Sequence, residues 1–133
     1  MKKQKVKAWF IPENIYQVPI NLLVSTDKKA VVEWLEKNYH KGEESDYAFL
    51  SDSANGHFLW EKGNRQVVIW IKDPNDIPCL SHEIIHYVIA VLEHRGVPLT
   101  EHCSEAFTYF HQSILTHAML ALGHQKLCGK NIL

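Results

Sequence analysis

The sequence has few of the residues that crosslink small secreted proteins or bind metals through sulfur. It contains only three cysteines, Cys79, Cys103 and Cys128, and no two of them form a CxxC pair. An odd number without such a pair argues against a disulfide framework and against a zinc site built from thiolates. We therefore expect a reducing compartment, the cytoplasm.

Long hydrophobic runs and an excess of one charge are also missing. No apolar stretch approaches the roughly 18 residues needed to cross a bilayer, and residues 12–14 interrupt the run after the basic start before it reaches the length of a leader peptide. The 14 basic and 15 acidic residues give a formal net charge of -1, which offers no bulk attraction to nucleic acid. Neither a membrane nor a nucleic acid is expected as a partner.

What is present suits one soluble domain that spans residues 1–133. A chain of 133 residues with 46% hydrophobic residues can bury one core of normal size. We find no internal repeats and no low-complexity segments. The last residues, 124–133, are predicted to fray from this domain.

The first half of the chain predicts strands followed by a helix. The segments KVKAWFIP and YQVPINLLVS are rich in β-branched and aromatic residues and predict one or two short strands before residue 25. Helical spacing of apolar residues predicts a helix from Asp27 to about Tyr39. Ser25 or Thr26 would cap this helix, and Gly42 would end it.

The second half predicts a hairpin followed by two long helices. Its strands are expected at Gly56–Glu61 and Arg65–Lys72, joined by a turn at KGN. One helix should run from about Ile77 to Arg95, and the last from near residues 102–104 to Leu122. The predicted fold class is α+β: a small, mostly antiparallel sheet with one N-terminal and two C-terminal helices.

The stretch CLSHEIIHYV, residues 79–88, carries the chemistry that this sequence suggests most clearly. On a helix, His82 and His86 point within about 40° of each other, so both can bind one zinc ion at about 2.0–2.1 Å. Glu83 lies at the flank of the pair, where it is better placed to accept a proton from a metal-bound water than to bind the metal. In a chain with nine histidines, the alternative is a solvated histidine face without metal.

The surroundings of the motif predict how it is placed. The opposite side of the helix is apolar, with Ile84, Ile85 and Val88 among its residues, and should pack on the sheet. The residues before and after the motif, Leu80-Ser81 and Tyr87-Val88, are uncharged, as are the two isoleucines within it, so we expect the site to lie in a dry wall.

A catalytic zinc site needs a third protein ligand. The three-histidine pattern HExxHxxGxxH is excluded because Ile89 and Leu92 occupy its last two positions. Glu105, on the next helix, is the candidate, because the seven-residue loop can span up to about 23 Å, more than the about 14 Å of helix to be retraced. His102 is the alternative ligand. Tyr109, one turn after Glu105, could donate to a developing oxyanion, although a packing role is the alternative.

A strand, an HExxH helix and a glutamate at the start of the next helix resemble the zincin metallopeptidases that use glutamate as third ligand. More narrowly, SHEIIHYVIAVLEHRGVPL…SEAFTYFHQSI is similar to short bacteriophage and prophage proteins described as zinc-peptidase-like. The resemblance covers about residues 65–116. It implies a minimal zincin in a bacterial or phage-infected cell, with His82, His86 and Glu105 binding Zn²⁺ and Glu83 as general base.

The resemblance also implies a substrate cleft, but this sequence departs from the pattern of the larger zincins. RQVVIWIKD would be the edge strand that pairs with an extended peptide. Larger glutamate-type zincins often have an aspartate four residues after the third ligand, where this chain has Tyr109. They also have a second lobe, for which 133 residues leave no room.

Two functions follow from these observations. The first is hydrolysis of a peptide or protein substrate by water activated by zinc and Glu83. The alternative is a non-catalytic binding or regulatory module of phage or prophage origin that keeps zinc for stability. Replacement of Glu83 distinguishes the two functions, because only the enzyme needs it.

Overall fold

The computed structural model describes residues 6–39 and 53–124. Its single four-stranded sheet has the strand order β1-β2-β4-β3. In chain order the elements are β1 (Lys7–Ile11), β2 (Ile20–Val24), α1 (Lys28–Asn38), β3 (Gly56–Leu59), β4 (Val67–Ile71), α2 (Ile77–His94), the 3-10 turn η2 (Glu101–Cys103) and α3 (Ser104–Ala121). This arrangement confirms the predicted α+β class, with one helix before and two after the hairpin.

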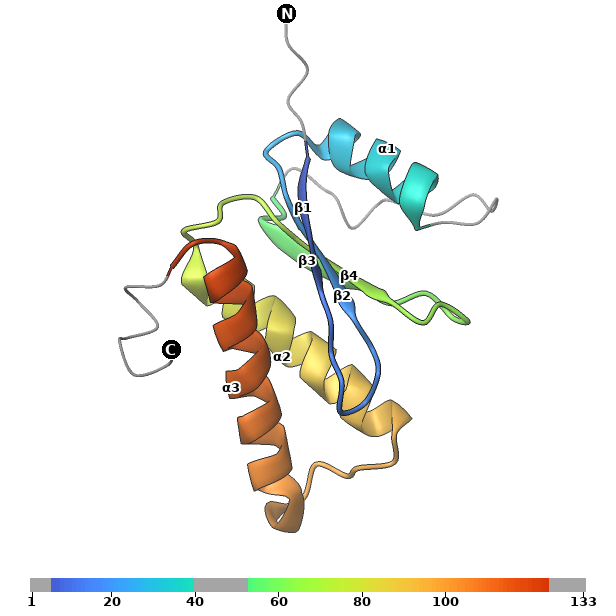
Figure 1. Ribbon diagram of the computed structural model, residues 1–133, viewed down its shortest axis with the longest axis vertical. Helices are drawn as coiled ribbons and strands as arrows, with labels where there is room; N and C mark the ends of the chain where they lie inside the picture. Colours follow the sequence, from blue (N-terminus) through green and yellow to red (C-terminus); the bar gives the residue numbers. More distant parts are fainter. Residues whose placement is uncertain (1–5, 40–52, 125–133) are drawn as a thin grey trace, which may run out of the picture.

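The sheet is mixed, with two antiparallel pairs and one parallel pair. β1 pairs with β2 and β3 pairs with β4 in antiparallel fashion, whereas β2 and β4 run parallel. Figure 1 shows α1 on one side of the sheet and α2 with α3 on the other. The parallel pair is possible because β2 and β4 are not consecutive, and α1 and the antiparallel strand β3 come between them in the chain.

Alternating residues of the central strands fill two separate cores. The larger core, on the side of α2 and α3, takes Val67, Ile69 and Ile71 from β4. The smaller core, under α1, takes Val68 and Trp70 from the same strand. Because β4 is buried on both faces, it reads as an uninterrupted apolar run.

This burial corrects the expectation that RQVVIWIKD forms the edge of the sheet. β4 lies between β2 and β3, and the edge strand beside α2 is β3. The run VVIWI, fully buried along its length, is typical of an internal strand, since an edge strand keeps polar residues on one side.

The helix ends are set by caps and glycines. Asp27, and not Ser25 or Thr26, caps α1, because its side chain accepts hydrogen bonds from the backbone of the first turn. Asp76 caps α2 in the same way. Gly96 and Gly123 follow the two long helices with φ of 74° and 88°, the left-handed conformation that glycine adopts without strain. The predicted end of the first helix at Gly42 lies outside the described residues, as do residues 125–133 of the predicted frayed tail.

The apolar face of α2 packs much as its periodicity predicts. Ile84, Val88, Val91 and Leu92 are fully buried. Ile85 is the exception, at 37% exposure, because it lies at the border of the apolar face, about 60° from His82 around the helix. None of the described helices is both long and apolar enough to cross a membrane.

Candidate metal centre and catalytic residues

The structure brings His82 and His86 together on one side of α2. Their Nε2 atoms lie 3.2 Å apart, and the rings meet edge to face with centroids 4.8 Å apart. Among the described residues neither imidazole makes another hydrogen bond, and both side chains are exposed. Both Nε2 atoms therefore face the same small region of space.

This spacing fits two ligands of one zinc ion. Two nitrogens at about 2.0–2.1 Å from a tetrahedral zinc lie about 3.3 Å apart, close to the 3.2 Å between the two Nε2 atoms. Zinc binds neutral imidazole nitrogens, and this pair presents its nitrogens free of carboxylate partners among the described residues. The two histidines thus supply half of a tetrahedral site.

Glu83 lies beside the pair but is buried, with 7% of its surface exposed. Burial raises the pKa of its carboxyl, although the charges of His82 and His86 and a hydrogen bond from the backbone of Phe58 oppose this shift. A carboxylate with a raised pKa is a better proton acceptor than one in water. The residue chemistry therefore suits a general base next to the histidines.

Strand β3 approaches α2 closely at this site. A Cβ on Gly56 would lie 2.7 Å from the Cys79 sulfur and 3.4 Å from Cγ of Glu83. Only glycine fits such a close approach of strand to helix. The hydrogen bond from Phe58 to Glu83 depends on this approach, since Phe58 is two residues further along β3.

The described residues do not assemble a third ligand. No group of three or more His, Cys, Asp or Glu side chains in residues 6–39 and 53–124 is arranged to hold a metal ion. Glu105 and His102 are exposed, on the first turn of α3 and in η2, and neither joins the pair. The ligand roles of Glu105 and His102 stay predictions.

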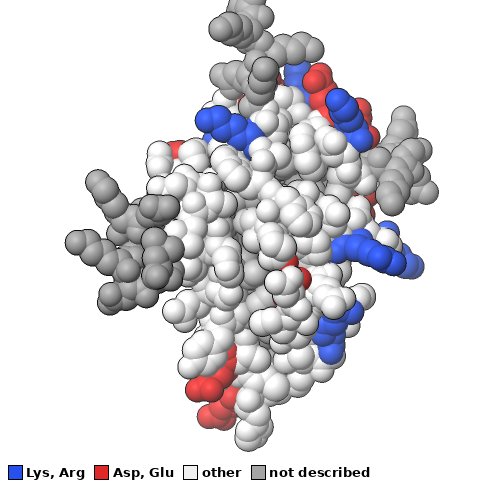
Figure 2. Space-filling view, viewed as in Figure 1, with Lys and Arg blue, Asp and Glu red and all other residues white. Residues whose placement is uncertain are grey.

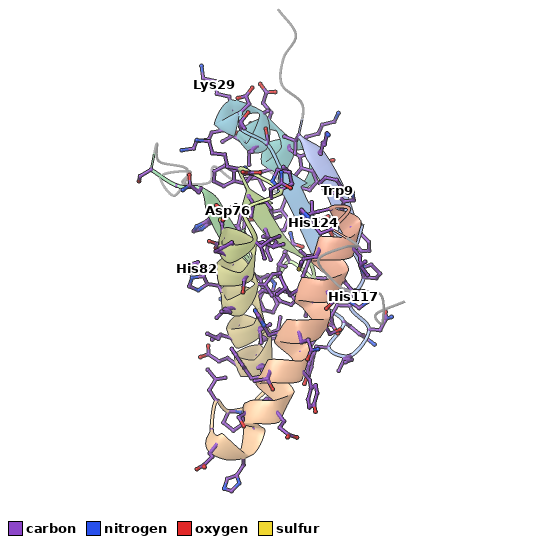
Figure 3. The ribbon with its side chains drawn as sticks, turned by 90° about the vertical axis from the view of Figure 1, so that its left-hand side faces the viewer. Trp9, Lys29, Asp76, His82, His117 and His124 are labelled. Atoms are coloured by element: carbon purple, nitrogen blue, oxygen red, sulfur yellow. The ribbon has the colours of Figure 1, made fainter. Side chains whose placement is uncertain are left out.

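α3 packs against α2 on the flank that carries Ser81. Ser81 Oγ lies 3.2 Å from His111 Nε2, which places α3 about 100° around α2 from His82. Figure 3 shows His82 projecting from α2 on the side away from α3. The loop returns the chain to α2, but to a different flank from the one that carries the two histidines.

Tyr109 lies on the outer side of α3. Its side chain is 65% exposed, and within the described residues it makes no hydrogen bond or ring contact. Its role as an oxyanion donor stays a prediction.

The prediction that the site lies in a dry wall is wrong for the two histidines and is confirmed for Glu83. His82 and His86 are exposed, whereas the neighbouring Glu83 and Ile84 are buried. The uncharged residues around the histidines do not shield them from water, because one of these residues, Ile85, is itself exposed.

His57, on β3, was not among the predicted site residues. Burial lowers the pKa of His57, and the nearby charge of His86 lowers it further. The histidine lies 25 residues before His82 in a strand without a motif. Only the packing of β3 against α2 brings it near the site.

A hollow of about 940 Å³ opens further along the same helix. Its walls are the C-terminal end of α2, the turn between β3 and β4, and the loop between β1 and β2. The residues that line it include Val18, Trp60, Lys62, Arg65, Ala90 and Glu93. No sequence motif predicts this hollow, because it forms where three distant segments meet.

Comparison of the chain with protein-family models, with curated proteins and with solved structures found no match. The assignment of a function therefore depends on the residues and the geometry described above.

Proposed function

We propose that this protein is a zinc-dependent peptidase in which His82 and His86 bind the metal and Glu83 is the general base. The observation that carries the proposal is the 3.2 Å spacing of the two Nε2 atoms next to a buried carboxyl. We propose Glu105 as third ligand, with His102 as the alternative. Zinc bound there would polarise a peptide carbonyl and lower the pKa of a water molecule.

The residues of the chain have distinct tasks in this proposal. The two imidazoles hold the metal through Nε2. Glu83 accepts a proton at its carboxylate and passes it to the leaving amine. The hydrogen bond from Phe58 orients the Glu83 carboxylate, which leaves its proton-accepting position fixed relative to the histidines.

The first test separates metal binding from catalysis. We expect wild-type protein purified without chelator to contain zinc in near-stoichiometric amount, and Glu83→Gln to retain it. We expect Glu83→Gln to cleave an unstructured protein such as casein at least about 100-fold more slowly, measured by the release of amino groups. His117→Ala is the matched control, since this exposed histidine lies on the opposite side of the molecule from His82 (Figure 3).

One observation favours a second function, a zinc-stabilised module without catalysis. The two histidines are exposed, so the pair lacks the water-excluding walls that catalytic sites use. Equal inactivity of zinc-loaded wild type and Glu83→Gln on a broad peptide library would support this module. Absence of zinc after attempted reloading would contradict both functions.

A further inference from the structure

We propose that the hollow at the C-terminal end of α2 is a peptide-binding subsite that receives an acidic side chain. The proposal deepens the proposed peptidase function and depends on it for the direction in which the peptide runs. It assigns the substrate class: an extended peptide with a glutamate or aspartate two or three residues from the histidine pair.

The position of the hollow follows from α2 and β3, which both lead to it from the histidines. Along α2, Ala90 and Glu93 line the hollow one and two turns after His86, a distance of about 6–10 Å. Along β3, Trp60 follows two residues, about 7 Å, after Phe58. An extended peptide advances about 3.3 Å per residue, so its second or third residue from the pair would reach the hollow.

The walls of the hollow are held in place by specific hydrogen bonds. On one side, the Glu13 carboxylate accepts N–H bonds from Ile15, Tyr16 and Val18, and the Tyr87 hydroxyl donates to the Val18 carbonyl at 2.6 Å. On the other side, the indole N–H of Trp60 donates to the Asn64 carbonyl at 2.8 Å. A pre-formed pocket of this size is typical of ligand sites.

The charges that line the hollow favour an acidic group. Lys62, Arg65 and Arg95 outnumber Glu61 and Glu93, in a chain whose formal net charge is -1. Within the part of the chain that the structure describes, Lys62 and Arg65 make no hydrogen bond or ion pair.

The N–H donors of the basic side chains that line the hollow are therefore largely free to bind a ligand. Arg95 gives one N–H to the Tyr16 carbonyl at 2.6 Å and keeps its other donors. A guanidinium with free donors binds a carboxylate through two parallel hydrogen bonds.

The test measures binding in the full-length Glu83→Gln protein, where cleavage does not interfere, and again in metal-free wild type. The probes are two pools of unstructured decapeptides, one with a single Glu at a scanned position among neutral residues and the other with Gln there. We expect the Glu pool to bind about fivefold more tightly, by fluorescence anisotropy. This preference should disappear in Arg65→Gln. It should persist in Lys29→Gln, which removes one positive charge from α1, on the opposite side of the sheet from α2 (Figure 1).

Each other outcome overturns the subsite. The subsite is contradicted if the two pools bind equally. It is also contradicted if the preference for Glu survives in Arg65→Gln, or if Lys29→Gln loses it to the same extent as Arg65→Gln. Failure of the peptidase function has a different signature: the Arg65-dependent preference would remain while no peptide is cleaved. Cleavage without the preference would leave the peptidase and remove the subsite.

Discussion

Two buried polar side chains connect the helices to the β3–β4 hairpin. Glu83 of α2 accepts a hydrogen bond from the backbone of Phe58. Tyr39, at the end of α1, donates from its hydroxyl to the Gln66 carbonyl and accepts from the Glu61 backbone N–H at 2.9 Å. A buried polar group with such partners stabilises one arrangement of the elements, because any other leaves it unsatisfied.

Tyr39 gives a prediction for the pH dependence of stability. Burial raises its pKa from the ordinary tyrosine value of 10.0 to about 12, so between these values the unfolded state loses a proton that the folded state keeps. The contribution is complete below about pH 10 and decreases as the pH rises toward 12. We expect Tyr39→Phe to lower the free energy of unfolding by about 1–3 kcal/mol at neutral pH and to make its decline above pH 10 shallower.

Urea denaturation between pH 8 and 11.5 measures both effects of the Tyr39 substitution. Tyr109→Phe is the control, because that side chain is exposed, and its profile should match wild type. A Tyr39→Phe profile parallel to wild type above pH 10 would contradict the prediction.

At the scale of elements, the contact between β3 and α2 determines the site. Gly56 permits this contact, since an added Cβ would meet the Cys79 sulfur at 2.7 Å and the Trp70 carbonyl oxygen at 3.0 Å. α2 contacts both strands of the hairpin directly. Any shift of β3 would move Phe58 relative to Glu83.

We therefore expect Gly56→Ala to lower the free energy of unfolding by about 1–3 kcal/mol through overpacking. Cys79→Ala removes the sulfur that the new Cβ would meet, so the double variant should recover part of this loss. Urea denaturation of the two single variants and the double variant gives the coupling energy. Additive effects of the two substitutions would show that the contact with the sulfur does not cause the loss of stability. The double variant should remain less stable than Cys79→Ala alone, because the Trp70 carbonyl that the new Cβ also meets belongs to the backbone.

Over the whole molecule, α2 carries the histidine pair and the hollow on one continuous strip. The histidine pair occupies its middle and the hollow its C-terminal end, while α3 packs on another flank through Ser81 and His111. Figure 2 shows a different face, over which Lys, Arg, Asp and Glu are sparse and gather mostly toward the rim. The proposed functions thus share one side of one helix, and that helix is anchored by the main core.

Metal binding should stabilise the whole molecule. If zinc binds the folded state at His82 and His86, zinc at about 100 times its dissociation constant adds about 2.7 kcal/mol to the free energy of unfolding. We expect the melting temperature of wild type to rise by several degrees on zinc addition and to fall back with chelator, measured by calorimetry. His82→Ala and His86→Ala should lose this rise.

The control for zinc stabilisation is His117→Ala, which should keep the full increase in melting temperature. An equal increase in all variants would indicate nonspecific binding by the other histidines of this chain. No increase in wild type would contradict metal binding at the pair.

The sequence by itself determined the helices, the hairpin and the pairing of His82 with His86, because these depend on local periodicity, caps and turns. The spacing of four residues on a helix places two imidazoles together without help from the rest of the chain. The flank position of Glu83 follows from the same geometry.

Only the tertiary structure decided which strand lies beside the histidines, where α3 packs and how the hollow forms. β4 is internal and β3 is the edge strand beside α2, His57 comes near His86 from a distant strand, and α3 packs on α2 at Ser81 and His111. These features depend on contacts between residues far apart in the chain, which spacing and loop length do not encode.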